Sequence, residues 1–252
     1  MNMSSINVNG DFITIIRMNP GKNYFLDNEL SFSAIDGTYT ETFTVDGKIS
    51  HVIIGVITGK ILTNGDFIVQ DIIVNDESCE CEGESKMREL EYLNATKYPA
   101  NIILLDRKLS YDRSLGIEIP KNAIGIVKDF DIPTRVSLNS IRETPWLAIK
   151  EKLNDLIKGY FKLFDVSWVF YLESSIFLDD LEKLLSILYI FGKEPVPEAL
   201  GYNYPLFLAD KLVKYYRNKI SNSFKLLELE DNIRYREFRS LMEKLRNDGK
   251  YI

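Results

Sequence analysis

The sequence contains very little histidine. Its 252 residues include a single one, His51. This excludes metal sites built from several histidines, and it weakens any serine–histidine–aspartate triad, because such a triad would need His51 in a cleft. The surrounding run ISHVIIGVITG is typical of a β-strand, so we interpret His51 as a structural residue.

Cysteine is almost as rare. Cys79 and Cys81 form one C-x-C pair inside the acidic stretch NDESCECEGES. A zinc site normally needs four ligands, and two cysteines with one distant histidine do not supply them. We therefore expect free thiols in a loop, in a cytoplasmic protein.

Long apolar runs and basic excess are also missing. No uninterrupted apolar run approaches the roughly 20 residues of a membrane-spanning helix, and the start MNMSSINVNGDF lacks the pattern of a signal peptide. We expect a cytoplasmic protein with no membrane contact. The net charge of -6 excludes a general polyanion binder. It still allows a nucleic-acid enzyme, since binding needs only a local basic stripe and metal-dependent sites are acidic. No G-x-x-x-x-G-K-[ST] motif is present, so we expect no nucleotide hydrolysis.

The first half of the chain alternates in the manner of β-strands. The runs SFSAIDGTYTETFTV, HVIIGVITGKI and DFIVQDIIV are separated by the hairpin signals Asp46-Gly47 and Asn64-Gly65. They predict a meander of antiparallel strands. Helical spacing then predicts a helix at about 84–97, and the apolar run NIILLD predicts a strand buried on both faces. A further strand is expected at NAIGIVKDF.

After Pro145 the pattern favours helices. We expect one at about 145–163, a strand at VSWVFYLES, and further helices at 178–191 and about 205–246. With no repeat and no low-complexity linker, residues 1–252 are expected to form a single domain. The order of elements predicts a mixed α/β fold of the ribonuclease H-like type, a central mixed sheet with flanking helices and a helical C-terminal part.

Two aspartates fall where this fold carries its chemistry. Asp36 stands at the expected end of the first meander strand, with Gly37 freeing the backbone to turn, and Asp106 ends the buried strand. Carboxylates at such positions hold two divalent ions in phosphodiester hydrolysis, and hard oxygen ligands suit Mg²⁺ or Mn²⁺. The alternative interpretation of each is a turn or capping aspartate.

Four blocks of sequence, in order, resemble the NurA family, nucleases that work with the HerA ATPase. They are AIDGT (34–38), ILLD (103–106), AIGIVK (123–128) and GYNYPLFLAD (201–210). They resemble the family's A-x-D-G-S, L-L-D-G-S-L, G-V-V-K and G-Y-P-Y-P-L-x-L-A-H blocks. The resemblance spans about residues 31 to 215 and implies a nuclease with a ribonuclease H-like fold.

The resemblance also implies a set of site residues. Asp36 and Asp106 match the family's metal-binding aspartates, and family spacing places the helix glutamate at Glu89, with Glu91 as a close rival. Tyr202 matches the tyrosine of the last block. The family's histidine is replaced here by Asp210, which can bind Mn²⁺ or Mg²⁺ through oxygen but cannot act as an imidazole. We expect a two-metal centre of Mn²⁺ or Mg²⁺ at Asp36, Glu89, Asp106 and Asp210, with Tyr202 orienting a phosphate or a ligand carboxylate.

Basic residues around these blocks are candidates for DNA binding. Arg107 and Lys108 stand where the family has Gly-Ser, and Lys128 ends the third block. The segment KLVKYYRNK places cations beside tyrosines on one side of a helix, a combination that suits single-stranded DNA. The alternative there is a solvated helix face. The candidate DNA-binding residues are thus Arg107, Lys108, Lys128, Lys211, Lys214 and Arg217.

The sequence therefore predicts a Mn²⁺- or Mg²⁺-dependent deoxyribonuclease. By resemblance it would be a homodimer that receives DNA ends from a HerA-like hexameric ATPase during end resection or a related repair task. The alternative is a paralogue that keeps the fold and binds DNA or the ATPase without cleaving. The loss of the histidine and the Arg107-Lys108 pair favour that alternative, whereas the retained acids argue against it.

Overall fold

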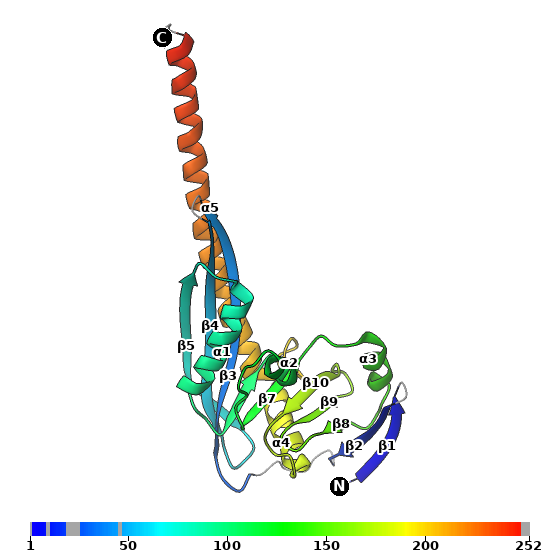
Figure 1. The fold of residues 1–252 in the computed structure, drawn as a ribbon. Coiled ribbons are helices and arrows are strands. Elements are labelled where there is room, and N and C mark those ends of the chain that lie inside the picture. The colour runs from blue at the N-terminus through cyan, green and yellow to red at the C-terminus, as the bar shows by residue number, and fades with distance from the viewer. Residues whose placement is uncertain (1, 9–10, 19–25, 45–46, 248–252) are drawn as a thin grey trace.

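The fold is built on one ten-stranded mixed sheet. The structure is a computed structural model that describes residues 2–8, 11–18, 26–44 and 47–247. The sheet order is β1-β2-β8-β9-β10-β7-β6-β3-β4-β5 (Figure 1). The strands are β1 (Asn2–Val8), β2 (Asp11–Arg17), β3 (Leu30–Thr44), β4 (Gly47–Ile61), β5 (Phe67–Cys79), β6 (Ile102–Leu105), β7 (Ala123–Val127), β8 (Trp146–Lys152), β9 (Ile157–Lys162) and β10 (Phe170–Ser174).

The predicted meander is confirmed. β3, β4 and β5 pair in antiparallel order, with β3 and β4 in continuous register from Leu30↔Ile61 to Thr44↔Gly47. Asp46 lies outside the described residues, whereas Gly65 adopts a positive φ of 80° in the turn before β5. The helix α1 (Gly83–Lys97) follows, and β6 then pairs parallel to β3. This order is the one expected for a ribonuclease H-like sheet, and the predicted mixed α/β class is confirmed.

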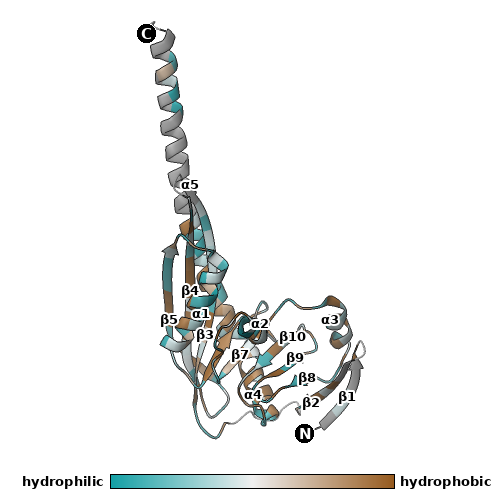
Figure 2. Ribbon diagram, in the orientation of Figure 1, coloured by the Kyte–Doolittle hydropathy of each residue, from teal (hydrophilic) through white to brown (hydrophobic). Residues whose placement is uncertain are grey.

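Helices cover both faces of the sheet. Helix α1 packs with the short α2 (Leu109–Ser114) on one face, in a cluster that includes Ile35 and Leu105. Helices α4 (Leu181–Gly192) and α5 (Tyr204–Asn247) pack on the other face, against Phe32 and Ala34. Since side chains alternate along a strand, odd residues of β3 face α1 and even residues face α5. Figure 2 shows hydrophobic residues concentrated in the central strands and α4.

The segment after Pro145 corrects the sequence prediction. In place of a helix over 145–163, it forms the antiparallel strands β8 and β9, and β8 also pairs with β2. The turn between them is closed by a hydrogen bond from the Leu153 N–H to the Leu156 carbonyl (2.8 Å). Helix α3 (Ile132–Asn139) precedes this region. Both strands contain consecutive buried residues, because their two faces are largely covered, and such runs do not show strand alternation.

The two cysteines and the single histidine make structural contacts. Cys79 and Cys81 form a disulfide with Cα atoms 5.3 Å apart, so the expectation of free thiols was wrong. His51 lies in β4 and hydrogen bonds to Thr42 Oγ1 (3.1 Å) and Ser78 Oγ (2.7 Å) on the neighbouring strands. This agrees with its interpretation as a structural residue.

Helix α5 is the longest element, with 44 residues. Its first part packs on β3 and β4, and its C-terminal part extends beyond the sheet (Figure 1). No helix within the described residues is long and apolar enough to cross a membrane.

Candidate active site

Asp36 and Asp106 lie on adjacent parallel strands. The last register pair between β3 and β6 is Ile35↔Leu105, and each aspartate is the next residue along its strand. Asp106 directly follows the fully buried β6, as expected. Asp36 does not end its strand, because β3 continues to Thr44. The strand that ends at this point is β6, and the charge of Asp106 acts on Asp36.

Helix α1 brings Glu91, not Glu89, toward these aspartates. A Cβ atom at Gly37 would lie 2.7 Å from Glu91 Oε1 and 2.7 Å from Met87 Cγ. The glycine thus serves the close approach of α1 and not a turn. Glu91 is 2% exposed. The side chain of Glu89 is 65% exposed, pairs with Lys86 (3.3 Å), and lines a separate hollow on the outer side of α1. The structure therefore does not bring Glu89 to the site.

Helix α5 brings Asp210 to the same place. Gly55 of β4 is the register partner of Asp36, and a Cβ at Gly55 would lie 2.9 Å from Val213 Cγ1 and 3.1 Å from the Ala209 carbonyl oxygen. This close contact seats the first turns of α5 over β4. The side chain of Asp210 is 17% exposed, and its charge acts on both Asp36 and Asp106.

Tyr202 and Lys128 complete the group around Asp106. The Tyr202 hydroxyl donates to Asp106 Oδ2 (3.3 Å), and Lys128 Nζ lies 3.2 Å from the same oxygen. Lys128 Nζ also lies 4.5 Å from the centre of the Tyr202 ring, a cation–π contact. Tyr202 is 3% exposed, so its hydroxyl points into the protein and toward the carboxylates.

The pKa values reflect the crowding of acids. Burial raises the pKa of Asp36 well above its ordinary value, and the charges of Glu91, Asp106 and Asp210 raise it further. Burial also raises the pKa of Asp106, while Lys128 opposes this rise. The pKa of Glu91 rises to about 7, because burial outweighs the attraction of Arg107. Several carboxylates that each disfavour the other's ionisation form a site for positive charge.

Cations of the chain itself already sit on three of these acids. Lys128 is on Asp106, Arg107 is hydrogen bonded to Glu91, and Lys214 lies 2.7 Å from Asp210. Within the described residues, no three His, Cys, Asp or Glu side chains form a ready-made metal site. The donor chemistry nevertheless fits a hard divalent ion, because Asp36, Asp106 and Asp210 offer only carboxylate oxygens, and the charges of Asp106 and Asp210 raise the pKa of Asp36. Asp36 and Asp106 are the residues that would hold it, with Asp210 beside them.

The remaining predicted DNA-binding residues are spread around this site. Lys211 of α5 pairs with Glu198, which precedes the helix (3.0 Å). Arg217, also on α5, donates to Thr38 Oγ1 of β3 (3.3 Å). Lys108 is exposed and lies over the Tyr171 ring (5.7 Å). Lys128 is at the centre, whereas Arg107 and Lys214 are engaged with acids. These placements leave their role in DNA binding a prediction.

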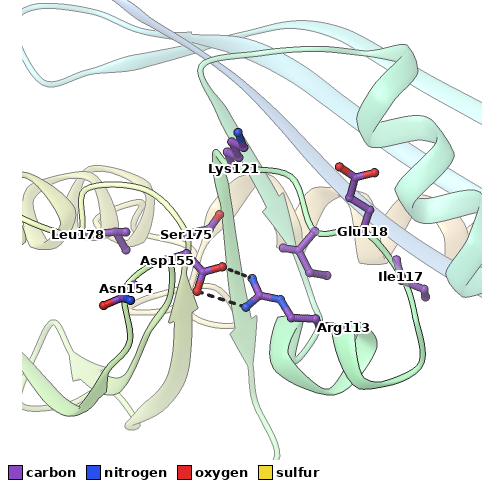
Figure 3. A pocket seen from close by; sticks show the side chains of 9 residues that line it. Arg113, Ile117, Glu118, Lys121, Asn154, Asp155, Ser175 and Leu178 are labelled. Carbon is purple, nitrogen blue, oxygen red and sulfur yellow. Dashed lines mark hydrogen bonds and ion pairs between the residues drawn. The ribbon is translucent and has the colours of Figure 1, made fainter.

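Two hollows of the surface differ in their relation to the carboxylates. One of about 420 Å³ borders the carboxylates at Lys128, Tyr202 and Asp210 and includes Trp168 and Arg135, which sequence reasoning missed. The run VSWVFYLES predicts a strand, and nothing in it indicates that the side chain of Trp168 is exposed. The other hollow, of about 550 Å³, is bordered by a bidentate ion pair between Arg113 and Asp155, with N–O distances of 3.1 and 3.3 Å (Figure 3). None of its lining residues belongs to the carboxylate site.

The fold, with Asp36 and Asp106 on adjacent strands, is the arrangement expected of a nuclease. The family model for the NurA domain matches residues 30–215, and this chain belongs to the NurA family. No protein with curated annotation matches the sequence.

Three solved structures are similar to this chain, and one of them has a TM-score above 0.5. The NurA nuclease from Sulfolobus solfataricus is 15% identical with a TM-score of 0.51, covering 80% of this chain and 86% of its own. An endonuclease V from Bacillus subtilis is 15% identical with a TM-score of 0.47, covering 77% of this chain and 83% of its own. Another NurA structure is 12% identical with a TM-score of 0.41, covering 73% and 84%. At this identity the Sulfolobus protein supports the fold alone.

Proposed function

We propose that this protein is a Mn²⁺- or Mg²⁺-dependent deoxyribonuclease that hydrolyses phosphodiester bonds at DNA ends. The observation that carries the proposal is the convergence of Asp36, Asp106 and Asp210 beside Tyr202, in a member of a nuclease family. Buried carboxylates that repel one another cost stability unless a cation compensates them. Their retention in one place therefore supports a site for metal-assisted hydrolysis.

Asp36 and Asp106 are the primary holders of the divalent ion, and Asp210 contributes directly or through water. When bound, a divalent ion activates water and stabilises charge on the phosphate and the leaving oxygen. The Tyr202 hydroxyl orients Asp106 by donating to Oδ2. Burial and the neighbouring acids raise the pKa of Tyr202, so it remains a proton donor at neutral pH and cannot add a further negative charge.

Lys128 has two possible partners in the mechanism. It lies 3.2 Å from Asp106 Oδ2 and 40% of its side chain is exposed, so it is accessible to an incoming phosphate. Transfer of Lys128 from Asp106 to a DNA phosphate would free Asp106 for the ion, and charge-assisted bonds to phosphate are strong enough to favour this exchange. We propose that Lys128 couples DNA binding to assembly of the site.

The cation pairs also favour a second candidate. Arg107 occupies Glu91, and the two side chains are only 12% and 3% exposed, so this pair does not exchange easily. A chain in which every acid keeps its internal cation would be a non-catalytic paralogue that binds DNA or the ATPase. Asp36 favours the nuclease, because no ion pair to it is found among the described residues.

The partners follow from the family. We propose that the protein acts in the cytoplasm as a homodimer and receives DNA ends from a HerA-type hexameric ATPase, in end resection or a related repair task. The family match, together with the absence of a nucleotide-hydrolysis motif in the sequence, supports a separate motor.

The test is degradation of end-labelled single- and double-stranded DNA with Mn²⁺, Mg²⁺ or EDTA. We expect cleavage with either metal and none with EDTA. Asp36→Asn and Asp106→Asn should each lose at least 100-fold in rate, as expected for loss of charge at an electrostatic catalytic site. Asp179→Asn is the matched control, since Asp179 is 98% exposed and pairs with the surface residue Lys152. A wild-type protein that binds DNA but cleaves with neither metal would establish the non-catalytic alternative.

A further inference from the structure

The turn between β9 and β10 exposes a tryptophan. Trp168 is 66% exposed, whereas Trp146, the other tryptophan of the chain, is 0% exposed. Tryptophan buries large apolar area when it can, so leaving this ring in water costs free energy. Among the described residues no aromatic ring stacks on Trp168. An exposed ring with a free face is a surface suited to a flat ligand.

The turn is fixed in place and does not merely project. Ser167 Oγ donates to the Phe164 carbonyl (2.9 Å) within it. Gly201, with a positive φ of 79°, packs against the turn so closely that a Cβ there would lie 2.3 Å from Ser167 Cβ. Gly201 directly precedes Tyr202. The tryptophan is thus held at a set position relative to the tyrosine that contacts Asp106.

Trp168 lines the hollow that borders the candidate active site. The hollow, of about 420 Å³, is within the range of ligand pockets, and its wall also includes Phe207. It shares Lys128, Tyr202 and Asp210 with the site. A group bound against Trp168 would therefore be next to the phosphate bound at Asp36 and Asp106.

The cations of the hollow are paired with exposed acids. Arg135 is 3.9 Å from Asp129 and Lys211 is 3.0 Å from Glu198. The Arg135 guanidinium also donates to the Lys128 carbonyl and lies 4.6 Å from the centre of the Phe130 ring, which holds it at the wall of the hollow. The side chains of Asp129 and Glu198 are 103% and 65% exposed, so these surface pairs are weak and readily exchanged. Lys128, Arg135 and Lys211 thus all line the hollow together with Trp168.

We propose that this hollow binds single-stranded DNA, with a base next to the scissile phosphate stacked on Trp168 and flanking phosphates held by Lys128, Arg135 and Lys211. An aromatic ring between cations is the arrangement by which proteins hold single strands without reading their sequence. The proposal rests on the proposed nuclease function only for its link to the carboxylates. DNA binding at Trp168 is a separate property that is measured without cleavage.

The experiment measures binding of a ten-nucleotide thymidine oligomer to the full chain in EDTA, where no cleavage occurs. Tryptophan fluorescence is the first readout, because Trp168 is accessible and Trp146 is not. We expect the oligomer to quench the wild-type protein and to protect it from acrylamide, and to do neither in Trp168→Phe. Anisotropy of a labelled oligomer gives the affinity. Trp168→Ala should weaken binding about tenfold or more, from the known range of base–aromatic stacking, whereas Trp168→Phe should keep most of it.

Two controls separate stacking from a structural effect. Val166→Ala changes a residue of the same turn that is 83% exposed and does not line the hollow, and it should leave the affinity unchanged. A set of oligomers with one abasic position is the second control. At the stacked position the abasic change should weaken wild-type binding about as much as Trp168→Ala does, and should cost Trp168→Ala nothing further.

The outcomes distinguish the two proposals. Quenching as described, together with an abasic change that costs Trp168→Ala nothing further, would support the stacking site. If there were also no cleavage in Mn²⁺ or Mg²⁺, the nuclease function would be rejected. Normal cleavage with unchanged affinity in Trp168→Ala would overturn the stacking site and leave the nuclease function standing. Equal loss of binding in Val166→Ala and Trp168→Ala would also overturn it, since the turn and not the ring would then be responsible.

Discussion

Gly55 is the direct register partner of Asp36, and its missing side chain allows α5 to lie close enough to place Asp210 beside that aspartate. Gly37, the next residue on β3, does the same for α1 and Glu91 on the other face. Two glycines on paired strands thus admit two helices, and the acids of both helices converge at the end of β6. The site depends on backbone proximity as much as on the acids themselves.

Gly55→Ala should move α5 and reduce activity. The new methyl group would meet the Ala209 carbonyl at 3.1 Å and Val213 Cγ1 at 2.9 Å, and the carbonyl belongs to the helix backbone and cannot rotate away. We expect destabilisation of about 1–3 kcal/mol and a fall in kcat of about tenfold with little change in KM. Chemical denaturation and steady-state cleavage measure the two effects.

The double variant Gly55→Ala, Val213→Ala is the matched control for this prediction. It removes the clash with Val213 Cγ1 and leaves the contact with the Ala209 carbonyl and an ordinary contact with Leu212 Cδ2. Part of the stability should return, and activity should return with it if helix position is the cause. Full activity in Gly55→Ala alone would show that Asp210 does not need its present place.

Glu91→Gln should impair cleavage, whereas Glu89→Gln should not. Glu91 is buried beside Gly37 and acts electrostatically on Asp36, while Glu89 is on the solvent side of the same helix. We expect at least a tenfold loss of kcat in the first variant, consistent with a charge removed from a buried site. Circular dichroism confirms that both variants fold. A loss confined to Glu89→Gln would restore the spacing inferred from the family.

The sequence predicted the central part of the fold because local signals and tertiary structure agree there. The β3–β5 meander, α1 and β6 were all expected, and Asp36 and Asp106 follow from that order. The choice between Glu89 and Glu91 could not be made, because both flank one apolar stripe and only the contact with Gly37 separates them. Asp36 was placed at a strand end because a glycine after an acid resembles a turn.

Other elements were decided by contacts that the sequence does not show. The apolar residues of 145–163 suit either a helix or a buried strand, and pairing of β8 with β2 selects the strand. The β1–β2 hairpin was not expected, although Asn9-Gly10 between two apolar runs is a hairpin signal. Residues 9 and 10 themselves lie outside the described part. The disulfide depends on the backbone bringing Cys79 and Cys81 within reach, which spacing alone does not establish.

Without metal, stability should fall as pH rises from 5 to 8. The pKa of Glu91 is about 7 in the folded chain against 4.5 for a free glutamate, so the folded state binds the extra proton between these values. Stability from this group is then present at low pH and lost as pH rises through 7. The shift corresponds to roughly 3 kcal/mol, and the raised pKa values of Asp36 and Asp106 act in the same direction.

Thermal unfolding in EDTA, followed from pH 5 to 8, measures this slope. Glu91→Gln should flatten it, since the amide does not titrate. Added Mn²⁺ or Mg²⁺ should raise the Tm more at pH 8 than at pH 5, because the ion must displace protons from the acids at low pH. Stability that instead rises steadily with pH over this range in EDTA would contradict the assignment of mutually repelling buried acids.

Asp210 and its helix partner Lys214 provide a test of whether the site is adapted or has lost its function. Asp210→Ala should lower the cleavage rate at least tenfold if its carboxylate contributes to ion binding, and Asp210→His should retain activity with a preference for Mn²⁺ over Mg²⁺. Lys214→Gln removes the cation 2.7 Å from Asp210 and should tighten ion binding. Calorimetric titration with Mn²⁺ measures each affinity. Unchanged affinity and rate in all three variants would remove Asp210 from the site.

Lys128→Gln should have opposite effects on the metal and on DNA. The lysine lies 3.2 Å from Asp106 Oδ2, so its removal frees that carboxylate and should tighten Mn²⁺ binding severalfold in the absence of DNA. The same change removes a phosphate contact and should raise KM for DNA, with a weaker salt dependence of binding. Lys121→Gln is the control, because Lys121 lines the hollow that is separate from the carboxylates. If Lys128→Gln weakened both metal and DNA binding, the lysine would be a support of the fold at Asp106 and Tyr202 and not an exchangeable partner. Tightened metal binding with an unchanged KM would mean that Lys128 competes with the metal for Asp106 and does not contact the DNA.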